Sequence, residues 1–185
     1  MSQHSIFRRH ALGLLLALSG PAWASEPLQD PSQFQYVTLP TDGDIDVRID
    51  ANGPRFVFKS GPSAFAAFRV PEGKGRYVVD VQSFLDPPQD PSKSRVFYPL
   101  VALLSGDFFV TRNLEDGQWR FDLPVYGRTT APAYRLVLGI DTAQSPERYL
   151  VIYTADAIGG TPLIGASSSG RLRISVHPDP TPDTP

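Results

Sequence analysis

The sequence predicts an all-β protein, a two-sheet antiparallel β-sandwich of about 8 to 10 strands with jelly-roll or Greek-key-like connections. Three observations indicate this fold. The chain holds 19 prolines and 15 glycines among 185 residues, which is typical of many short elements joined by turns. Its apolar runs are short or alternate with period 2. Beyond the first two dozen residues, no window of about eleven residues keeps apolar positions at helical spacing.

The first expected strand, Asp44–Asp50, shows the alternation most clearly. Ile45, Val47 and Ile49 are predicted to point inward, and the charged residues between them to face water. Further strands are expected, in order, at Arg55–Lys59, Ala64–Val70, Arg76–Phe84, Val96–Leu104, Phe108–Arg112, Trp119–Leu123, Tyr134–Ile140, Tyr149–Thr154 and Arg171–Val176. Turn residues separate them, at Asn52–Pro54, Gly61–Pro62, Pro71–Gly73, Pro87–Pro88, Ser105–Gly106, Asp116–Gly117 and Pro146.

The connections carry their own predictions. Ser105–Gly106 and Glu115–Gly117 are typical of hairpin turns. The proline-rich stretch Phe84–Arg95 resembles the crossing that a Greek key requires. The segment Ala155–Gly170 is rich in Gly, Ser and Thr and is predicted to be a mobile loop.

Two runs, Pro99–Leu104 and Tyr149–Tyr153, are apolar at every position rather than at alternate ones. A strand buried on one face only does not need this pattern. We therefore expect central strands whose outer face is covered by a loop or by a partner.

The N-terminus has the organisation of a signal peptide. Basic residues (Arg8, Arg9) precede the apolar run Ala11–Ser19, and small residues stand at Ala22 and Ala24. We expect cleavage after Ala24 and a periplasmic location. The Arg pair alone is a weak twin-arginine signal, so Sec export is favoured with the other route left open. The apolar run is about half the ~20 residues of a membrane helix, so no transmembrane segment is expected.

The expected organisation is therefore a signal peptide (residues 1–24), a disordered linker (25–33), the β-sandwich domain (34–176) and a disordered Pro/Asp-rich tail (177–185). With no cysteine in the chain, neither disulfides nor a thiol-linked lipid anchor can form.

Charge and histidine content exclude several functions. The chain has 17 basic and 19 acidic residues, and removal of residues 1–24 takes away two arginines and no acids, so nucleic-acid binding is not expected. His177 is the only imidazole after processing, which disfavours Ser-His-Asp catalysis and histidine-ligated zinc. We predict no enzyme activity, metal or other cofactor. Glycoside hydrolysis by two carboxylates is not excluded by spacing, but solubilising charge is the preferred interpretation of the acids.

Aromatic side chains are the candidate ligand-binding residues, because a flat ring can pack against the C–H face of a pyranose. Tyr98 and Tyr126 are expected to be exposed, next to the proline-rich crossing and in a loop respectively. Trp119 is the third candidate, although the pattern of its strand, with Phe121 on the same face, favours a core position.

Four segments resemble the maltose operon periplasmic protein family. They are Gly61–Pro71, Val96–Leu104, Arg148–Thr154 and Gly170–Ile174, and the similarity extends over Phe34–Val176. These motifs are apolar patterns and turns and carry no catalytic residue. This chain lacks the additional C-terminal segment of longer members.

The resemblance implies a periplasmic, β-rich, non-enzymatic accessory protein of carbohydrate transport. Its expected partner is maltodextrin, an outer-membrane porin or another transport protein. The alternative is an envelope protein-interaction β-sandwich module with no sugar ligand, motivated by the strands that are apolar on both faces.

Overall fold

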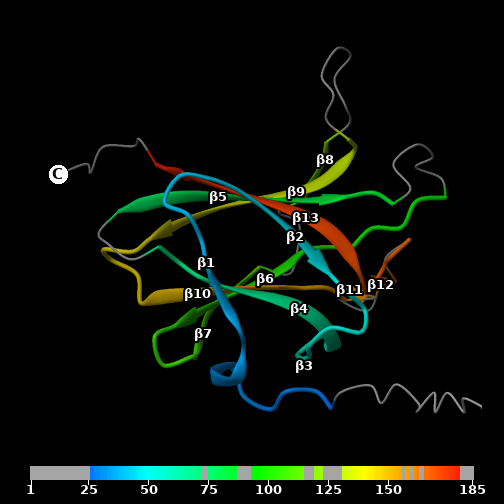
Figure 1. Ribbon diagram of the computed structural model, residues 1–185, viewed down its shortest axis with the longest axis horizontal. Helices are drawn as coiled ribbons and strands as arrows, with labels where there is room; N and C mark the ends of the chain where they lie inside the picture. The colour runs from blue at the N-terminus through cyan, green and yellow to red at the C-terminus, as the bar shows by residue number, and fades with distance from the viewer. Residues whose placement is uncertain are drawn as a thin grey trace, which may run out of the picture.

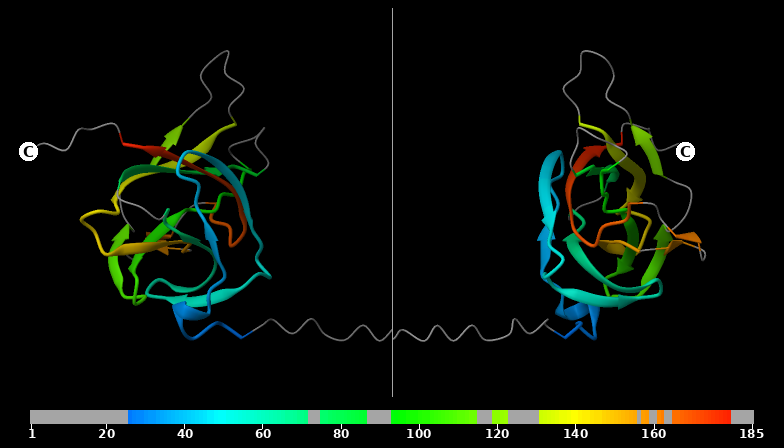
Figure 2. Two further views of the ribbon diagram at one scale, coloured as in Figure 1. Left: turned by 60° about the vertical axis from the view of Figure 1, so that its left-hand side comes forward. Right: turned by 90° about the vertical axis from the view of Figure 1, so that its right-hand side faces the viewer.

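The structure is a computed structural model that describes residues 26–71, 75–86, 93–114, 119–122, 131–155, 157–158, 161–162 and 165–179. These residues form two layered β-sheets (Figure 1), so the predicted β-sandwich class is confirmed. The two sheets contain six and five strands, slightly more than the sequence predicts. Figure 2 shows the same layers from two further directions.

The five-stranded sheet has the order β2-β13-β5-β9-β8, and all its pairs are antiparallel. Its strands are β2 (Gly43–Ile49), β13 (Gly170–Pro178), β5 (Arg76–Phe84), β9 (Ala133–Asp141) and β8 (Trp119–Asp122). The last strand of the chain therefore lies between the second and the fifth, which requires crossing connections of the Greek-key kind.

The six-stranded sheet has the order β1-β4-β10-β6-β7, and β3 also pairs with β4. Its strands are β1 (Tyr36–Thr38), β4 (Gly61–Arg69), β10 (Glu147–Tyr153), β6 (Leu100–Ser105), β7 (Val110–Leu114) and β3 (Arg55–Phe58). The pair β1–β4 is parallel and the others are antiparallel. Two further short strands, β11 (Ala157–Ile158) and β12 (Thr161–Pro162), pair within the segment predicted to be a loop.

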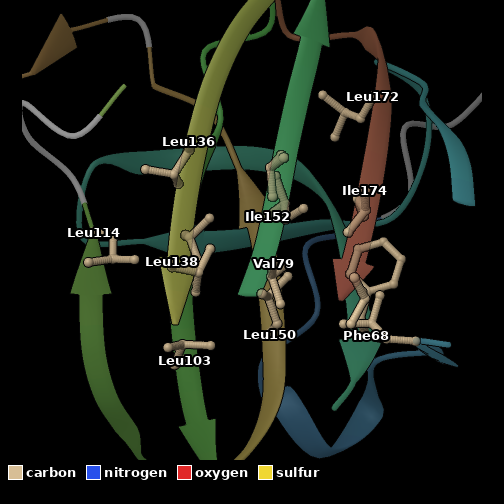
Figure 3. Packing of buried hydrophobic residues seen from close by; sticks show 14 of the residues in the cluster. Phe68, Val79, Leu103, Leu114, Leu136, Leu138, Leu150, Ile152, Leu172 and Ile174 are labelled. Carbon is tan, nitrogen blue, oxygen red and sulfur yellow. The ribbon is translucent and has the colours of Figure 1, made fainter. Parts of the chain in front are cut away.

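The main core fills the space between the sheets. Figure 3 shows apolar side chains of both layers meeting there, among them Val79 and Leu136 from one sheet and Leu103 and Ile152 from the other. As predicted for Asp44–Asp50, its three branched residues pack on this core: Ile49 is buried, and Ile45 and Val47 are partly buried. The alternation in β2 therefore places its charged residues on the outer face of the five-stranded sheet.

A second apolar layer covers the outer face of the six-stranded sheet. Val151 and Tyr153 of β10 are buried there. Phe34 packs on Phe65 with ring centroids 4.2 Å apart, and the ring of Phe58 stacks on Tyr153 at 3.9 Å. Both runs that are apolar at every position are thus central strands with a covered outer face, as predicted, and residues 28–58 of the chain itself contribute to the cover.

The linker predicted to be disordered has a defined structure in its described part, residues 26–33. The backbone N–H of Leu28 donates to the Arg55 carbonyl, and Leu28 packs on the second apolar layer. A 3-10 turn, Pro31–Gln33, follows and carries a capping box with Asp30. Partial burial of Leu28 and satisfied backbone groups order this segment. The short strand β1 that follows was not predicted.

Strand boundaries also differ from the prediction. The expected strand Val96–Leu104 begins only at Leu100, because Pro99 has no backbone N–H to donate. The expected strand Phe108–Arg112 begins at Val110, because Phe108 lies in the turn with φ 64°.

One hairpin is confirmed and one is wrong. Ser105 opens the turn between the paired strands β6 and β7, with its N–H bonded to the Phe109 carbonyl. The turn predicted at Glu115–Gly117 lies outside the described residues, and the strands on either side of it, β7 and β8, belong to different sheets and so do not form a hairpin. The predicted boundary of the tail at residue 177 is wrong, since β13 continues through His177 to Pro178; residues 180–185 lie outside the described residues.

Candidate functional site

A cleft opens on the outer face of the five-stranded sheet, where β2, β13 and β5 lie side by side (Figure 1). It consists of two adjoining hollows of about 360 Å³ and 530 Å³. Both hollows are lined by Arg48, Phe84 and Arg171. We call the two together the Phe84 cleft.

Strand alternation explains why these side chains meet. Residues opposite one another in antiparallel strands share a face. Arg171 lies opposite Arg48, and Arg173 lies opposite Asp46. Phe84 stands at the end of β5 and is partly exposed. The floor of the cleft is therefore an aromatic ring surrounded by guanidinium groups.

Arg173 and Asp46 form an ion pair with two hydrogen bonds, in which Arg173 Nε and Nη2 donate to the carboxylate at 2.8 and 3.1 Å. These bonds hold the pKa of Asp46 below its ordinary value and raise the pKa of Arg173. The guanidinium of Arg173 also lies 5.9 Å from the centroid of the Phe84 ring, within cation–π distance. The charges of Arg173 and Asp46 therefore compensate each other beside the Phe84 ring.

The cleft is lined by three other arginines besides Arg173. Arg48 and Arg171 come from β2 and β13, and Arg95 comes from the segment that precedes β6. Among the residues that the structure describes, none forms an ion pair with Arg48, Arg95 or Arg171. The cleft therefore offers guanidinium groups whose charge no neighbouring carboxylate satisfies.

Two further acids, Asp50 and Asp86, line the first hollow. Both are exposed, and the carboxylate of Asp50 accepts a hydrogen bond from the N–H of Asn52 at 2.9 Å. A glycosidase general acid needs a carboxyl whose pKa is raised by burial. Exposed carboxylates on the rim suit binding of a ligand better than proton transfer to it.

Of the predicted ligand-binding residues, Tyr98 does not line this cleft. Tyr98 is 6% exposed, its ring packs on Tyr134 at 4.8 Å, and its O–H donates to the Tyr134 hydroxyl at 3.4 Å. The expectation that Tyr98 is exposed is therefore wrong, and burial raises its pKa. Trp119 belongs to β8, where its backbone lies opposite Leu136. Tyr126 lies outside the described residues.

The residues of the Phe84 cleft were not singled out from the sequence. Their one signal is the alternation of Asp44–Asp50 and Arg171–Val176, which predicts that Arg48 and Arg171 face outward. Nothing in the sequence gives the register that sets these two arginines opposite each other, because their strands are more than a hundred residues apart. Phe84 was expected only as a strand end.

Within the described residues, neither the His177–Asp42 contact nor any group of metal-ligating side chains gives a second site. His177 Nδ1 lies 2.9 Å from an Asp42 carboxylate oxygen, and both side chains are exposed. No three His, Cys, Asp or Glu side chains of the described ranges lie close enough to hold a metal ion. In the part of the chain that the structure describes, no helix has the length and apolarity to cross a membrane.

Fold and site together define a β-sandwich with an open, charged cleft on one sheet. No family model matches the sequence, and neither a curated protein nor a solved structure matches the chain.

Proposed function

We propose that this protein is an exported, non-enzymatic accessory protein that binds an oligosaccharide in the Phe84 cleft. The observation that carries the proposal is the partly exposed Phe84 ring, shared by two hollows and bordered by hydrogen-bonding side chains. Sugar sites combine such a ring with polar groups that bond hydroxyls. Arg48, Arg171 and Gln82 supply these groups here.

The sequence supports the setting of this proposal. Its first two dozen residues have the pattern of a signal peptide, which favours a periplasmic location. The resemblance to the maltose operon periplasmic protein family favours a role in carbohydrate transport, with maltodextrin as a ligand or a porin or transport protein as a partner.

Isothermal titration with maltoheptaose and with an acidic oligosaccharide tests the proposal. We expect heat with at least one of them, and a loss of affinity of at least tenfold in Phe84→Ala. Phe84→Leu keeps apolar packing without the flat ring and should show the same loss, which separates stacking from misfolding. The control is Val137→Ala, which alters another outward residue of the same sheet, 47% exposed. If neither saccharide binds the intact protein, the proposal is wrong.

The second candidate function is that of an envelope protein-interaction module. The faces that first motivated it are covered by the chain's own residues. One other observation favours it: Phe109, directly before β7, and Val110, the first residue of β7, are 73% and 62% exposed. Crosslinking in periplasmic extracts should then give a defined partner that is lost in Phe109→Ser, and the same partner with the variant argues against it.

A further inference from the structure

The arginine pair of the Phe84 cleft, Arg48 and Arg171, forms no ion pair with the other described residues. Arg48 and Arg171 lie directly opposite each other on adjacent strands, and like charges in this position are destabilising. At the next pair on the same face, two residues along, Arg173 meets Asp46, and across the sheet Arg135 pairs with Asp80. The sheet holds a second pair of opposed arginines, Arg120 and Arg135, but Arg135 forms ion pairs with Asp80 and Asp122. The pair in the cleft differs because neither Arg48 nor Arg171 has an acidic partner among the described residues.

The guanidinium of Arg95 is the third one that lines the same hollow, and backbone hydrogen bonds hold its segment in place. Asp86 and Arg95 exchange two backbone hydrogen bonds, of 2.9 and 2.8 Å, which hold the segment before β6 beside the end of β5. Ser167 and Ser169 line the hollow as well and add hydroxyl groups. Side chains from four separate parts of the chain thus converge beside Phe84.

The acids of the cleft do not cancel this charge. Asp46 is engaged by Arg173, and Asp50 already accepts the N–H of Asn52. Asp86 is the remaining carboxylate of the first hollow, and it is exposed. A backbone N–H leaves the charge of Asp50 in place, so three guanidinium groups face two carboxylates, Asp50 and Asp86. The remaining excess of positive charge favours an anionic ligand.

We propose that the Phe84 cleft recognises an acidic oligosaccharide, one that carries carboxylate groups as uronic acids do. The planar fork of a guanidinium donates two parallel hydrogen bonds to a carboxylate, and the Phe84 ring offers an apolar surface to the sugar ring. A small inorganic anion would use the arginines and leave the ring without a role. This inference rests on the proposed function and narrows its ligand.

The test compares three probes by isothermal titration on the intact mature protein: heptagalacturonate, maltoheptaose and inorganic phosphate. We expect heptagalacturonate to bind at least tenfold more tightly than either of the others, and its affinity to fall as sodium chloride is added, because salt screens exposed charges. Arg48→Gln and Arg171→Gln should each weaken it about tenfold or more. Arg120→Gln is the matched control, an exposed arginine at the opposite edge of the same sheet, and should change nothing.

The outcomes separate the two proposals. Equal affinity for maltoheptaose, or no effect of Arg48→Gln and Arg171→Gln, overturns the acidic ligand and leaves the oligosaccharide site standing. Phosphate binding as tight as that of heptagalacturonate identifies a bare anion site and also overturns it. No binding of either saccharide refutes the proposed function itself.

Discussion

Replacing Gly170 by alanine tests the packing between β13 and the segment before β6. A Cβ at this position would lie 2.5 Å from Cβ of Phe97, whereas carbon atoms pack at about 3.5 to 4.0 Å. One of the two backbones must therefore move by roughly 1 Å. Phe97 cannot yield easily, because it is fully buried and its carbonyl accepts a hydrogen bond from Ser83 Oγ at 2.5 Å.

Such overpacking costs about 1 to 3 kcal/mol, and for a domain of this size each kcal/mol lowers Tm by roughly 2 to 4 °C. We expect Gly170→Ala to unfold about 2 to 12 °C below the parent in a thermal melt followed by circular dichroism. The control is Gly139→Ala, where nothing lies within 4 Å of the new Cβ and stability should stay level or rise by about 0.5 kcal/mol. An unchanged Tm in Gly170→Ala would refute the close approach to Phe97.

Three further predictions concern other parts of the fold. Phe34→Ala should lower the free energy of unfolding in urea by about 3 kcal/mol, because Phe34 is a buried part of the second apolar layer. A loss below about 1 kcal/mol would mean that Phe34 does little to hold this layer in place. Arg171→Glu should stabilise the protein by roughly 0.5 kcal/mol by setting an opposite charge against Arg48, and a lower Tm would contradict the repulsive pair. The carboxyl of Asp46, followed by NMR, should titrate below its ordinary pKa because of Arg173. The stabilising effect of this ionised carboxyl is therefore present above the unfolded-state pKa and is lost as the pH falls through the folded-state pKa. Arg173→Gln should return the pKa of Asp46 to the ordinary value.

The fold class could be predicted because it depends on local patterns. The alternation of Asp44–Asp50 and the turn residues between runs are visible in the sequence, and burial of one strand face requires no knowledge of the partner strand. Runs that are apolar throughout likewise predicted a covered outer face. They did not show that Leu28, Phe34 and Phe58 help to form that cover, because contacts between distant segments leave no periodic signal.

The site could not be predicted for the same reason. Phe84, Arg48 and Arg171 are unremarkable in the sequence, and only the pairing of β13 with both β2 and β5 brings them together. The search for exposed aromatic residues selected Tyr98 by its neighbouring prolines, yet its ring is buried against Tyr134. A residue next to a turn is not thereby exposed, since the turn can itself be packed over.

The two sheets differ in a way that decides where a ligand can bind. The outer face of the six-stranded sheet carries an apolar layer in which the side chains of Phe34 and Phe58 are packed, so part of the chain itself covers this face. The outer face of the five-stranded sheet is polar and carries the Phe84 cleft. Stability favours opposite charges across strands, so the arginine pair in that cleft, which has no acidic partner among the described residues, supports the proposal that this face binds an anionic ligand.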